Sequence, residues 1–127
     1  MTPLETARAF LSAMEKMDYD AALPLIADEA EYINGASPGV QGPDGVRQTL
    51  EPFFAPLEAN EFIIQREAVQ GTVVFIERLD RHLAGHGWFE LPVTGVFEVN
   101  DGKITFWREY FDLAVIQDDI ARIMAAG

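Results

Sequence analysis

The sequence predicts an α+β fold in which helices pack on one face of a curved β-sheet, and three observations lead to this prediction. Apolar residues recur at helical spacing near both ends of the chain and in one segment of the first half. The second half instead alternates and is rich in β-branched and aromatic side chains. Helices separated from a run of strands are typical of α+β domains. The 127 residues contain no repeat or linker, so we expect a single domain over residues 1–127.

Three helices are predicted in the first half of the chain. The first begins at Thr2-Pro3-Leu4-Glu5, where Thr suits the N-cap, Pro the first helical position and Glu the closing position of a capping box. A second, short helix is predicted over Ala21 to Ile26. A third is predicted from about Asp44, and Pro52 should end or kink it. The apolar residues that define the first and third helices are Leu4, Ala7, Phe10, Leu11 and Met14, and Val46, Leu50, Phe53 and Phe54.

The predicted strands are one early strand, Glu29 to Asn34, and a four-strand antiparallel meander in the second half. A Gly- and Pro-rich loop, Gly35 to Gly45, follows the early strand. Asn100-Asp101-Gly102 marks a hairpin turn, because Gly accepts a positive φ. A terminal helix carries Ile116, Ile120 and Ile123. The strands of the meander are predicted over Asn60–Ala68, Thr72–His82, Trp88–Asn100 and Lys103–Phe111.

Composition excludes several classes of function. The chain has 9 Lys and Arg against 21 Asp and Glu, a formal charge of -12, so phosphate backbones and anionic membranes are poor partners. It has no Cys, which excludes disulfides, thiol catalysis and thiolate metal sites. The first residues resemble no secretory signal, and no apolar run is long enough to span a membrane. We therefore expect a cytoplasmic protein that binds neither nucleic acid nor membrane.

A charged pair lies on one predicted strand of the meander. Because side chains alternate across a strand, Val74, Ile76, Arg78 and Asp80 share one face. If the two aliphatic residues face inward, an Arg and an Asp point into the interior beside them. The alternative is a solvated ion pair near a strand end, which would contribute little.

Two further segments carry polar residues that could meet this pair. In the last strand, Phe106, Arg108, Tyr110 and Asp112 share a face if the strand is regular. Asp112 also precedes the terminal helix, where Asp is a favoured N-cap, and a cap whose second oxygen faces a cavity could also act as a base. Tyr32 and Asn34 project from the same face of the early strand and together could hold a water molecule, although a turn Asn before Gly is common.

Taken together, these segments resemble the limonene-1,2-epoxide hydrolase family, within the nuclear transport factor 2-like superfamily. The similarity covers essentially the whole chain in the order of its elements, and its most specific part is the stretch from Gly95 to Asp112. It departs mainly in Ala36 to Gly42 and His82 to Leu91. The motifs that carry it are Tyr32-Ile33-Asn34, Glu77-Arg78-Leu79-Asp80, Gly95-Val96-Phe97-Glu98-Val99 and Trp107-Arg108-Glu109-Tyr110-Phe111-Asp112.

The resemblance implies a cone-shaped, curved sheet and hydrolysis of an epoxide in one step. Asp112 would be the general base, acting on a water that Tyr32 and Asn34 also hold. Asp80 would be the general acid, and Arg78 would lie between the two carboxylates and bind both. Two carboxylates beside one Arg can share a proton only in a buried, apolar pocket. We expect Val74, Ile76, Phe106 and Tyr110 to contribute to its wall and to contact the substrate.

The expected partners are a small, apolar, cyclic or terpene-like epoxide and water, and the resemblance makes a homodimer plausible. No cofactor is implied. His82 and His86 are four residues apart, but the pattern places no third ligand, so we expect no metal.

Two other functions fit the same pocket. A ketosteroid isomerase- or polyketide cyclase-like enzyme would use a carboxylate base with Tyr32 or Tyr110 as proton donor, but would not need the Arg78–Asp80 pair. The third possibility is a non-catalytic binder of an apolar ligand.

Overall fold

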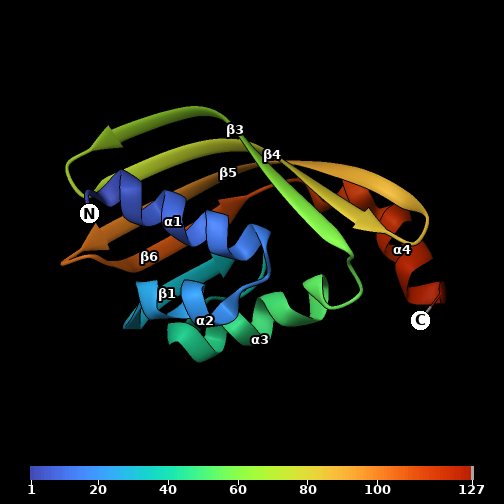
Figure 1. Cartoon of the computed structure of the whole chain (residues 1–127), viewed down its shortest axis with the longest axis horizontal. Coiled ribbons are helices and arrows are strands. Elements are labelled where there is room, and N and C mark those ends of the chain that lie inside the picture. Colours follow the sequence, from blue (N-terminus) through green and yellow to red (C-terminus); the bar gives the residue numbers. More distant parts are fainter. Residues whose placement is uncertain (127) are drawn as a thin grey trace.

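The computed structural model describes residues 1–126 and consists of one open six-stranded sheet with helices against it (Figure 1). The strand order is β2-β1-β6-β5-β4-β3, with every neighbouring pair antiparallel except β1 and β6, which are parallel. The strands are β1 (Ile26–Asn34), β2 (Val40–Gln41), β3 (Ala59–Gln70), β4 (Val73–Ala84), β5 (Gly87–Asn100) and β6 (Lys103–Tyr110). The helical elements are α1 (Pro3–Glu15), α2 (Tyr19–Ala22), η1 (Leu23–Leu25), α3 (Gly42–Phe54), η2 (Leu113–Ile116) and α4 (Gln117–Ala126), of which η1 and η2 are short 3₁₀ turns.

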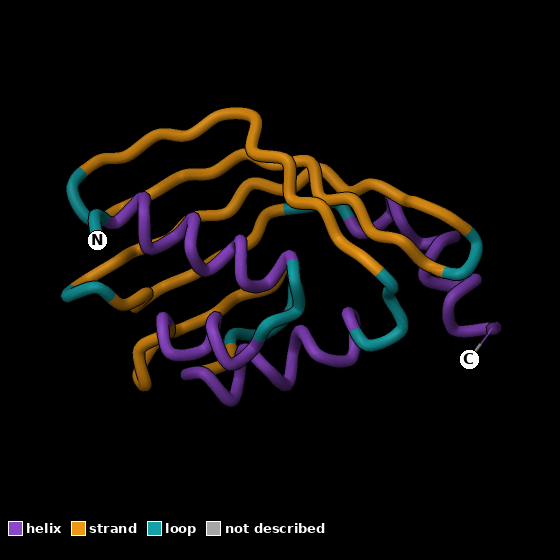
Figure 2. Tube along the Cα trace, viewed as in Figure 1, coloured by secondary structure: helices purple, strands orange, loops and turns teal. Residues whose placement is uncertain are grey.

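The α+β prediction is confirmed, and the sheet is strongly curved. Figure 2 shows β3, β4 and β5 bending over α1 and α3, which lie on the same side of the sheet. The helix α1 packs against β3 to β6, and α3 packs against β1 and β2, so the enclosed face carries the core. At the other end of the molecule, α4 lies near the β4–β5 hairpin (Figure 1). There the His86 ring contacts Asp119 at 2.9 Å.

The helix ends follow the predicted chemistry. Thr2 accepts a hydrogen bond from the amide of Glu5, and the Glu5 carboxylate accepts one from the amide of Thr2, which completes the capping box of α1. The helix α3 begins at Gly42, two residues earlier than predicted, and ends only two residues beyond Pro52. Proline near a C-terminus costs little, because few further turns depend on the bond that it removes. The short helix is divided between α2 and η1.

The four predicted strands of the meander are confirmed, and each end lies within two residues of its prediction. On β4, every second residue from Val74 to Ala84 is buried, as the alternation predicts. In the β5–β6 turn, Asp101 and Gly102 both adopt positive φ, of 53° and 76°. The segment predicted as a loop contains the short strand β2, which pairs with β1.

One irregularity in β6 decides which residues face the interior. The β5–β6 register shifts between Glu98, opposite Phe106, and Val99, opposite Ile104, so Thr105 is an extra residue on β6. Such a β-bulge reverses the alternation that follows it. Ile104 is buried, and after the bulge the buried positions are Trp107 and Glu109. Consequently Glu109, and not its even-numbered neighbours, points toward the core.

Within residues 1–126, no helix is both long enough and apolar enough to cross a membrane.

Candidate active site

Arg78 lies at the centre of a buried network of two carboxylates. Its Nε and Nη2 donate to Asp80 Oδ1 and Oδ2 at 2.9 and 2.8 Å. Its Nη2 and Nη1 donate to Glu109 Oε1 and Oε2 at 2.6 and 3.2 Å. Arg78 is 2% exposed, and Asp80 and Glu109 are each 6% exposed. The Arg78–Asp80 pair is thus an interior pair, and the alternative of a solvated surface pair is excluded.

The sheet places Asp80, Arg78 and Glu109 in a row that runs across its strands. Arg78 and Asp80 belong to β4 and Glu109 to β6, so the guanidinium must reach across the intervening strand β5. It crosses at Gly95, where a Cβ atom would come within 2.5 Å of Glu109 Oε2 and 2.9 Å of Arg78 Nη1. The absence of a side chain at Gly95 is what leaves room for the network.

Tyr32 and Asn34 lie on the Glu109 side of this row. Their strand, β1, is the neighbour of β6, and the parallel register sets Tyr32 beside Trp107 and Asn34 beside Glu109. The Tyr32 ring stacks on Trp107, with centroids 4.0 Å apart and planes at 12°. The Tyr32 hydroxyl is buried and has no hydrogen-bond partner among the described residues. A buried hydroxyl without a protein partner is suited to hold a water or a substrate oxygen.

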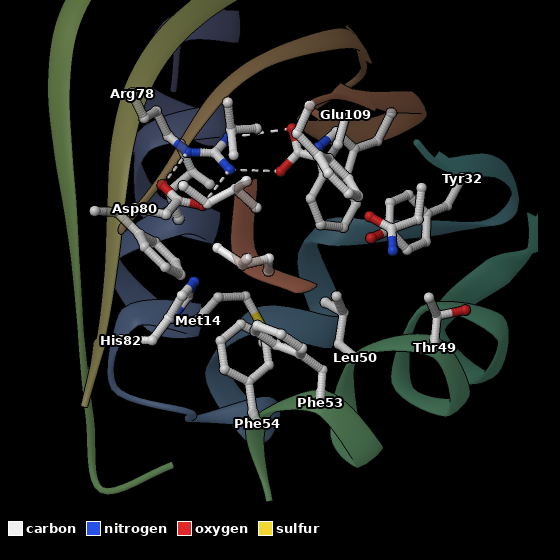
Figure 3. Close-up of a pocket in the computed structure, with 18 of the residues that line it drawn as sticks. Met14, Tyr32, Thr49, Leu50, Phe53, Phe54, Arg78, Asp80, His82 and Glu109 are labelled. Atoms are coloured by element: carbon white, nitrogen blue, oxygen red, sulfur yellow. Dashed lines mark hydrogen bonds and ion pairs between the residues drawn. The ribbon is translucent and has the colours of Figure 1, made fainter. Parts of the chain in front are cut away.

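The network opens into a cavity that is apolar elsewhere (Figure 3). Its volume of about 130 Å³ far exceeds the 10–15 Å³ or so that one water requires, so it can admit a small organic molecule. Figure 3 shows Glu109 and Tyr32 on one side of the cavity, and Asp80 and His82 on the other. Most of the remaining lining comes from α1, α3, η2 and α4, chiefly Phe10, Met14, Leu50, Phe53, Phe54, Leu113, Ile116 and Ile120.

Burial governs the titration of this site. It raises the pKa of Glu109 above its usual value, against the opposing effect of the Arg78 cation. Burial also acts to lower the pKa of Arg78, but the charges and hydrogen bonds of Glu109 and Asp80 outweigh it, so that Arg78 remains a cation. Burial and then the Glu109 charge raise the pKa of Tyr32, which stays a neutral hydroxyl.

The predicted position of Asp112 is wrong. Asp112 is exposed and accepts a hydrogen bond from the amide of Ala114 at 3.0 Å, capping η2, and it does not line the described cavity. The bulge at Thr105 explains the difference, because it turns the even-numbered residues of β6 outward. The second carboxylate bound to Arg78 is Glu109, a residue that the strand pattern alone does not predict to face the interior. The signal that could have identified it is its place on the odd-numbered face with the large aromatic residue Trp107.

The predicted wall residues are also corrected. Val74 and Ile76 share the inner face with Arg78, as predicted, but they are packed in the core without lining the described cavity. Phe106 and Tyr110 lie on the outer face of β6 beyond the bulge, and Tyr110 is 52% exposed. The actual wall comes largely from helices, whose faces the strand pattern does not report.

The two histidines have separate environments. His82 is buried, and its Nδ1 contacts Asn60 Oδ1 at 2.7 Å. His86 instead contacts Asp119 from α4. Burial lowers the pKa of His82 to about 4, so this ring is neutral at neutral pH.

Comparison with known proteins gives a consistent result. The model of the limonene-1,2-epoxide hydrolase catalytic domain matches residues 1–122. The chain is 33% identical over 105 residues to epoxide hydrolase EphG of Mycobacterium tuberculosis, covering 83% of this chain and 70% of that protein. It superposes on an M. tuberculosis LEH-like epoxide hydrolase with a TM-score of 0.79 at 30% identity, covering 98% of this chain and 92% of the other.

More distant structures share the fold alone. One is a protein with a ketosteroid isomerase-like fold from Catenulispora acidiphila, with a TM-score of 0.80 at 19% identity, covering 93% of this chain and 92% of the other. The nuclear transport factor 2-like fold and the hydrolase prediction are therefore both confirmed. By its sequence and its fold, the chain belongs to the limonene-1,2-epoxide hydrolase family.

Proposed function

We propose that this protein adds water to an epoxide in one step, with Glu109 as general base and Asp80 as general acid. The observation that carries the proposal is the bridging of two buried carboxylates by one guanidinium. Arg78 fixes the separation of Asp80 and Glu109 and holds both at the edge of an apolar cavity. In the reaction proposed, Glu109 takes the role that the sequence had suggested for Asp112.

The order of the polar residues across the sheet suggests which carboxylate is the base and which is the acid. Tyr32 and Asn34 flank Glu109 on β1 and would hold the attacking water with it. Glu109 removes a proton from that water, whose oxygen forms a bond to an epoxide carbon as the carbon–oxygen bond of the ring breaks. Asp80, on the far side of Arg78, donates its proton to the departing oxygen. Return of the proton from Glu109 to Asp80 restores the starting state.

The charge balance supports a single shared proton. One cation faces two carboxylates in an interior site, so a second negative charge is uncompensated. Burial raises the pKa of Glu109, so the pair keeps a shared proton at higher pH than an isolated carboxyl would, and the proposed reaction starts from the arrangement in which that proton is on Asp80. It also makes the ionised form of Glu109 a stronger base.

The lining indicates the class of substrate. Aromatic and aliphatic side chains form most of the wall, which favours a small, neutral, apolar epoxide of the cyclic or terpene-like kind. The product would be a vicinal diol. Because water attacks carbon directly, we expect inversion at the attacked carbon.

The roles can be tested with a matched set of carboxylate variants. Glu109→Gln and Asp80→Asn each remove one proton-transfer group at nearly constant volume, so each should lower kcat by about 10²- to 10⁴-fold. Asp112→Asn is the control, because Asn caps a helical segment as well as Asp does and should leave turnover nearly unchanged. If Asp112→Asn were as inactive as Glu109→Gln, the assignment of the base would be refuted.

Isotope labelling distinguishes direct attack from a covalent route. A single turnover in heavy-oxygen water should place the label in the diol, with chiral analysis showing inversion. Label in the carboxylate of Asp80 or Glu109 would instead show that an ester to the enzyme forms and is then hydrolysed.

We also propose that the protein is a homodimer formed through the outer face of its sheet. The outer face carries four large apolar residues that are about half exposed, Ile63, Phe75, Trp88 and Tyr110. Burial of such residues against a second copy would remove apolar surface from water. Sedimentation equilibrium tests this, and a monomer at micromolar concentration would refute it.

A further inference from the structure

The cavity has a second polar group that the hydrolysis proposed above does not use, the imidazole of His82. It lines the cavity two residues beyond Asp80 on the same face of β4. Residues so spaced on a strand are about 7 Å apart, so His82 lies further along the cavity from the acid. Figure 3 shows it between Asp80 and the phenyl rings of α3.

Aromatic rings enclose His82. The centroids of Phe53 and Phe89 are 5.1 and 5.2 Å from the imidazole, and those of Phe54 and Phe62 are 6.0 and 6.3 Å away. A phenyl or aliphatic side chain would fill such a site without burying a polar ring. The presence of an imidazole therefore requires an explanation beyond packing.

Asn60 fixes the chemical state of this ring. The side chains of Asn60 and His82 face each other across the β3–β4 pair, and His82 Nδ1 lies 2.7 Å from Asn60 Oδ1. With the amide oriented as in the structure, its oxygen faces Nδ1 and can only accept, so Nδ1 carries the proton that it donates; Asn60 Nδ2 is then buried without a partner among the described residues. With the pKa of His82 lowered to about 4 by burial, the ring is neutral and Nε2 carries no proton.

Nε2 is consequently a hydrogen-bond acceptor in an apolar part of the cavity. Among residues 1–126, the one side-chain hydrogen bond that the His82 ring makes to a protein group is at Nδ1, to Asn60. The nearest ionisable neighbour on the same face of the strand, Asp80, accepts hydrogen bonds from Arg78 at both of its oxygens.

We infer that His82 is a specificity-determining residue that accepts a hydrogen bond from the substrate. The substrate would then be an apolar epoxide that bears one hydrogen-bond donor, such as a hydroxyl group, a few carbon atoms from the ring oxygen. This inference rests on the proposed function, because it assumes that the epoxide is placed at Asp80. It narrows the substrate class from apolar epoxides in general to epoxides that also carry an alcohol.

Three cyclohexene oxides test the inference. They carry –CH₂OH, –CH₂OCH₃ or –CH₂CH₃ on the ring carbon across from the epoxide, so the substituent is a donor and acceptor, an acceptor only, or neither. We expect kcat/KM for the alcohol to exceed that for the ether and the ethyl compound by about three- to tenfold, the value of one neutral hydrogen bond. Equal preference for alcohol and ether would mean that His82 donates, and would overturn the inference.

Variants of the chain assign any preference to His82. In His82→Phe the preference for the alcohol should disappear while turnover of the ethyl compound remains. Should this variant fold poorly because Asn60 loses its partner, the double variant Asn60→Leu with His82→Phe removes both polar groups together. A preference that survives in a folded variant would overturn the inference.

One measurement is independent of turnover. Long-range ¹H–¹⁵N correlation of the free protein identifies the protonated nitrogen of each of its 2 histidines, and His82→Phe assigns the signals. A proton on Nδ1 of His82 is expected, and a proton on Nε2 would overturn the inference whatever the activity. Absence of turnover for all three epoxides, with Nδ1 protonated, would instead count against the proposed function and with it this substrate class.

Discussion

Gly95→Ala should inactivate the enzyme far more than it destabilises it. The new Cβ would lie 2.5 Å from Glu109 Oε2, 2.9 Å from Arg78 Nη1 and 3.0 Å from Phe97 Cε2. To restore an ordinary contact of 3.4 Å, the Glu109 carboxylate must move by about 0.9 Å (3.4 minus 2.5), in a network where its shorter bond to Arg78 is 2.6 Å. A displacement approaching 1 Å in a reacting group costs about 10²-fold in rate.

The effect on stability should be smaller. Overpacking in an interior costs about 1–3 kcal/mol, and replacing Gly in a strand recovers roughly 0.5–1 kcal/mol of it. We therefore expect a net loss of about 0–2.5 kcal/mol in the free energy of unfolding, with kcat reduced by about 10²-fold.

The assay combines steady-state kinetics with urea unfolding. Gly85→Ala is the matched control, because a Cβ there would meet no atom within 4 Å and its φ is not positive. Full activity in Gly95→Ala would refute the claim that this position makes room for the ion-pair network. A loss of both activity and folding would show that its role is chiefly structural.

Two further predictions concern the polar residues around the network. Tyr32→Phe should lower kcat by about 10-fold or more, because the attacking water loses one of its hydrogen-bond partners. The urea concentration at the midpoint of unfolding should change little, because only a hydroxyl is removed. Unchanged kinetics would contradict the proposal that Tyr32 holds the water. His82 binds a proton in the unfolded chain below about pH 6.5 and in the folded protein only below about 4. The unfolded state therefore takes up more protons between these values, so stability is lost as the pH falls from 7 to 4, by about 3 kcal/mol for this group. Urea unfolding across that pH range should show a steeper loss of unfolding free energy for the native sequence than for His82→Phe. The same pH dependence in both proteins would show that His82 is not the cause.

Local rules were sufficient to predict most of the fold. The capping box of α1, the alternation of β4 and the turn at Asp101 are each determined by residues adjacent in sequence, and all three are confirmed. The short strand β2 was missed because two residues give no period, and its existence depends on pairing with β1.

The site was only partly predictable. Arg78 and Asp80 were predicted to face the interior because side chains alternate on a regular strand, and the structure buries both. The same reasoning failed for β6, because Thr105 forms a bulge whose position depends on the partner strand and not on local sequence. Because of this one extra residue, Glu109 lies on the inner face where a regular strand would have placed Asp112. The role of Gly95 was equally hidden, since it arises from side chains on two other strands.

The true position of Asp112 has a consequence for the shape of the cavity. As the cap of η2, it sets where the chain leaves β6 and begins the segment that supplies Leu113, Ile116 and Ile120 to the wall. The helix that continues this segment, α4, has no fully buried residue. Walls with few buried contacts open at the lowest free-energy cost. A bulky substrate would accordingly displace the carboxyl-terminal segment of the wall, and the sheet with its proton-transfer groups would stay in place.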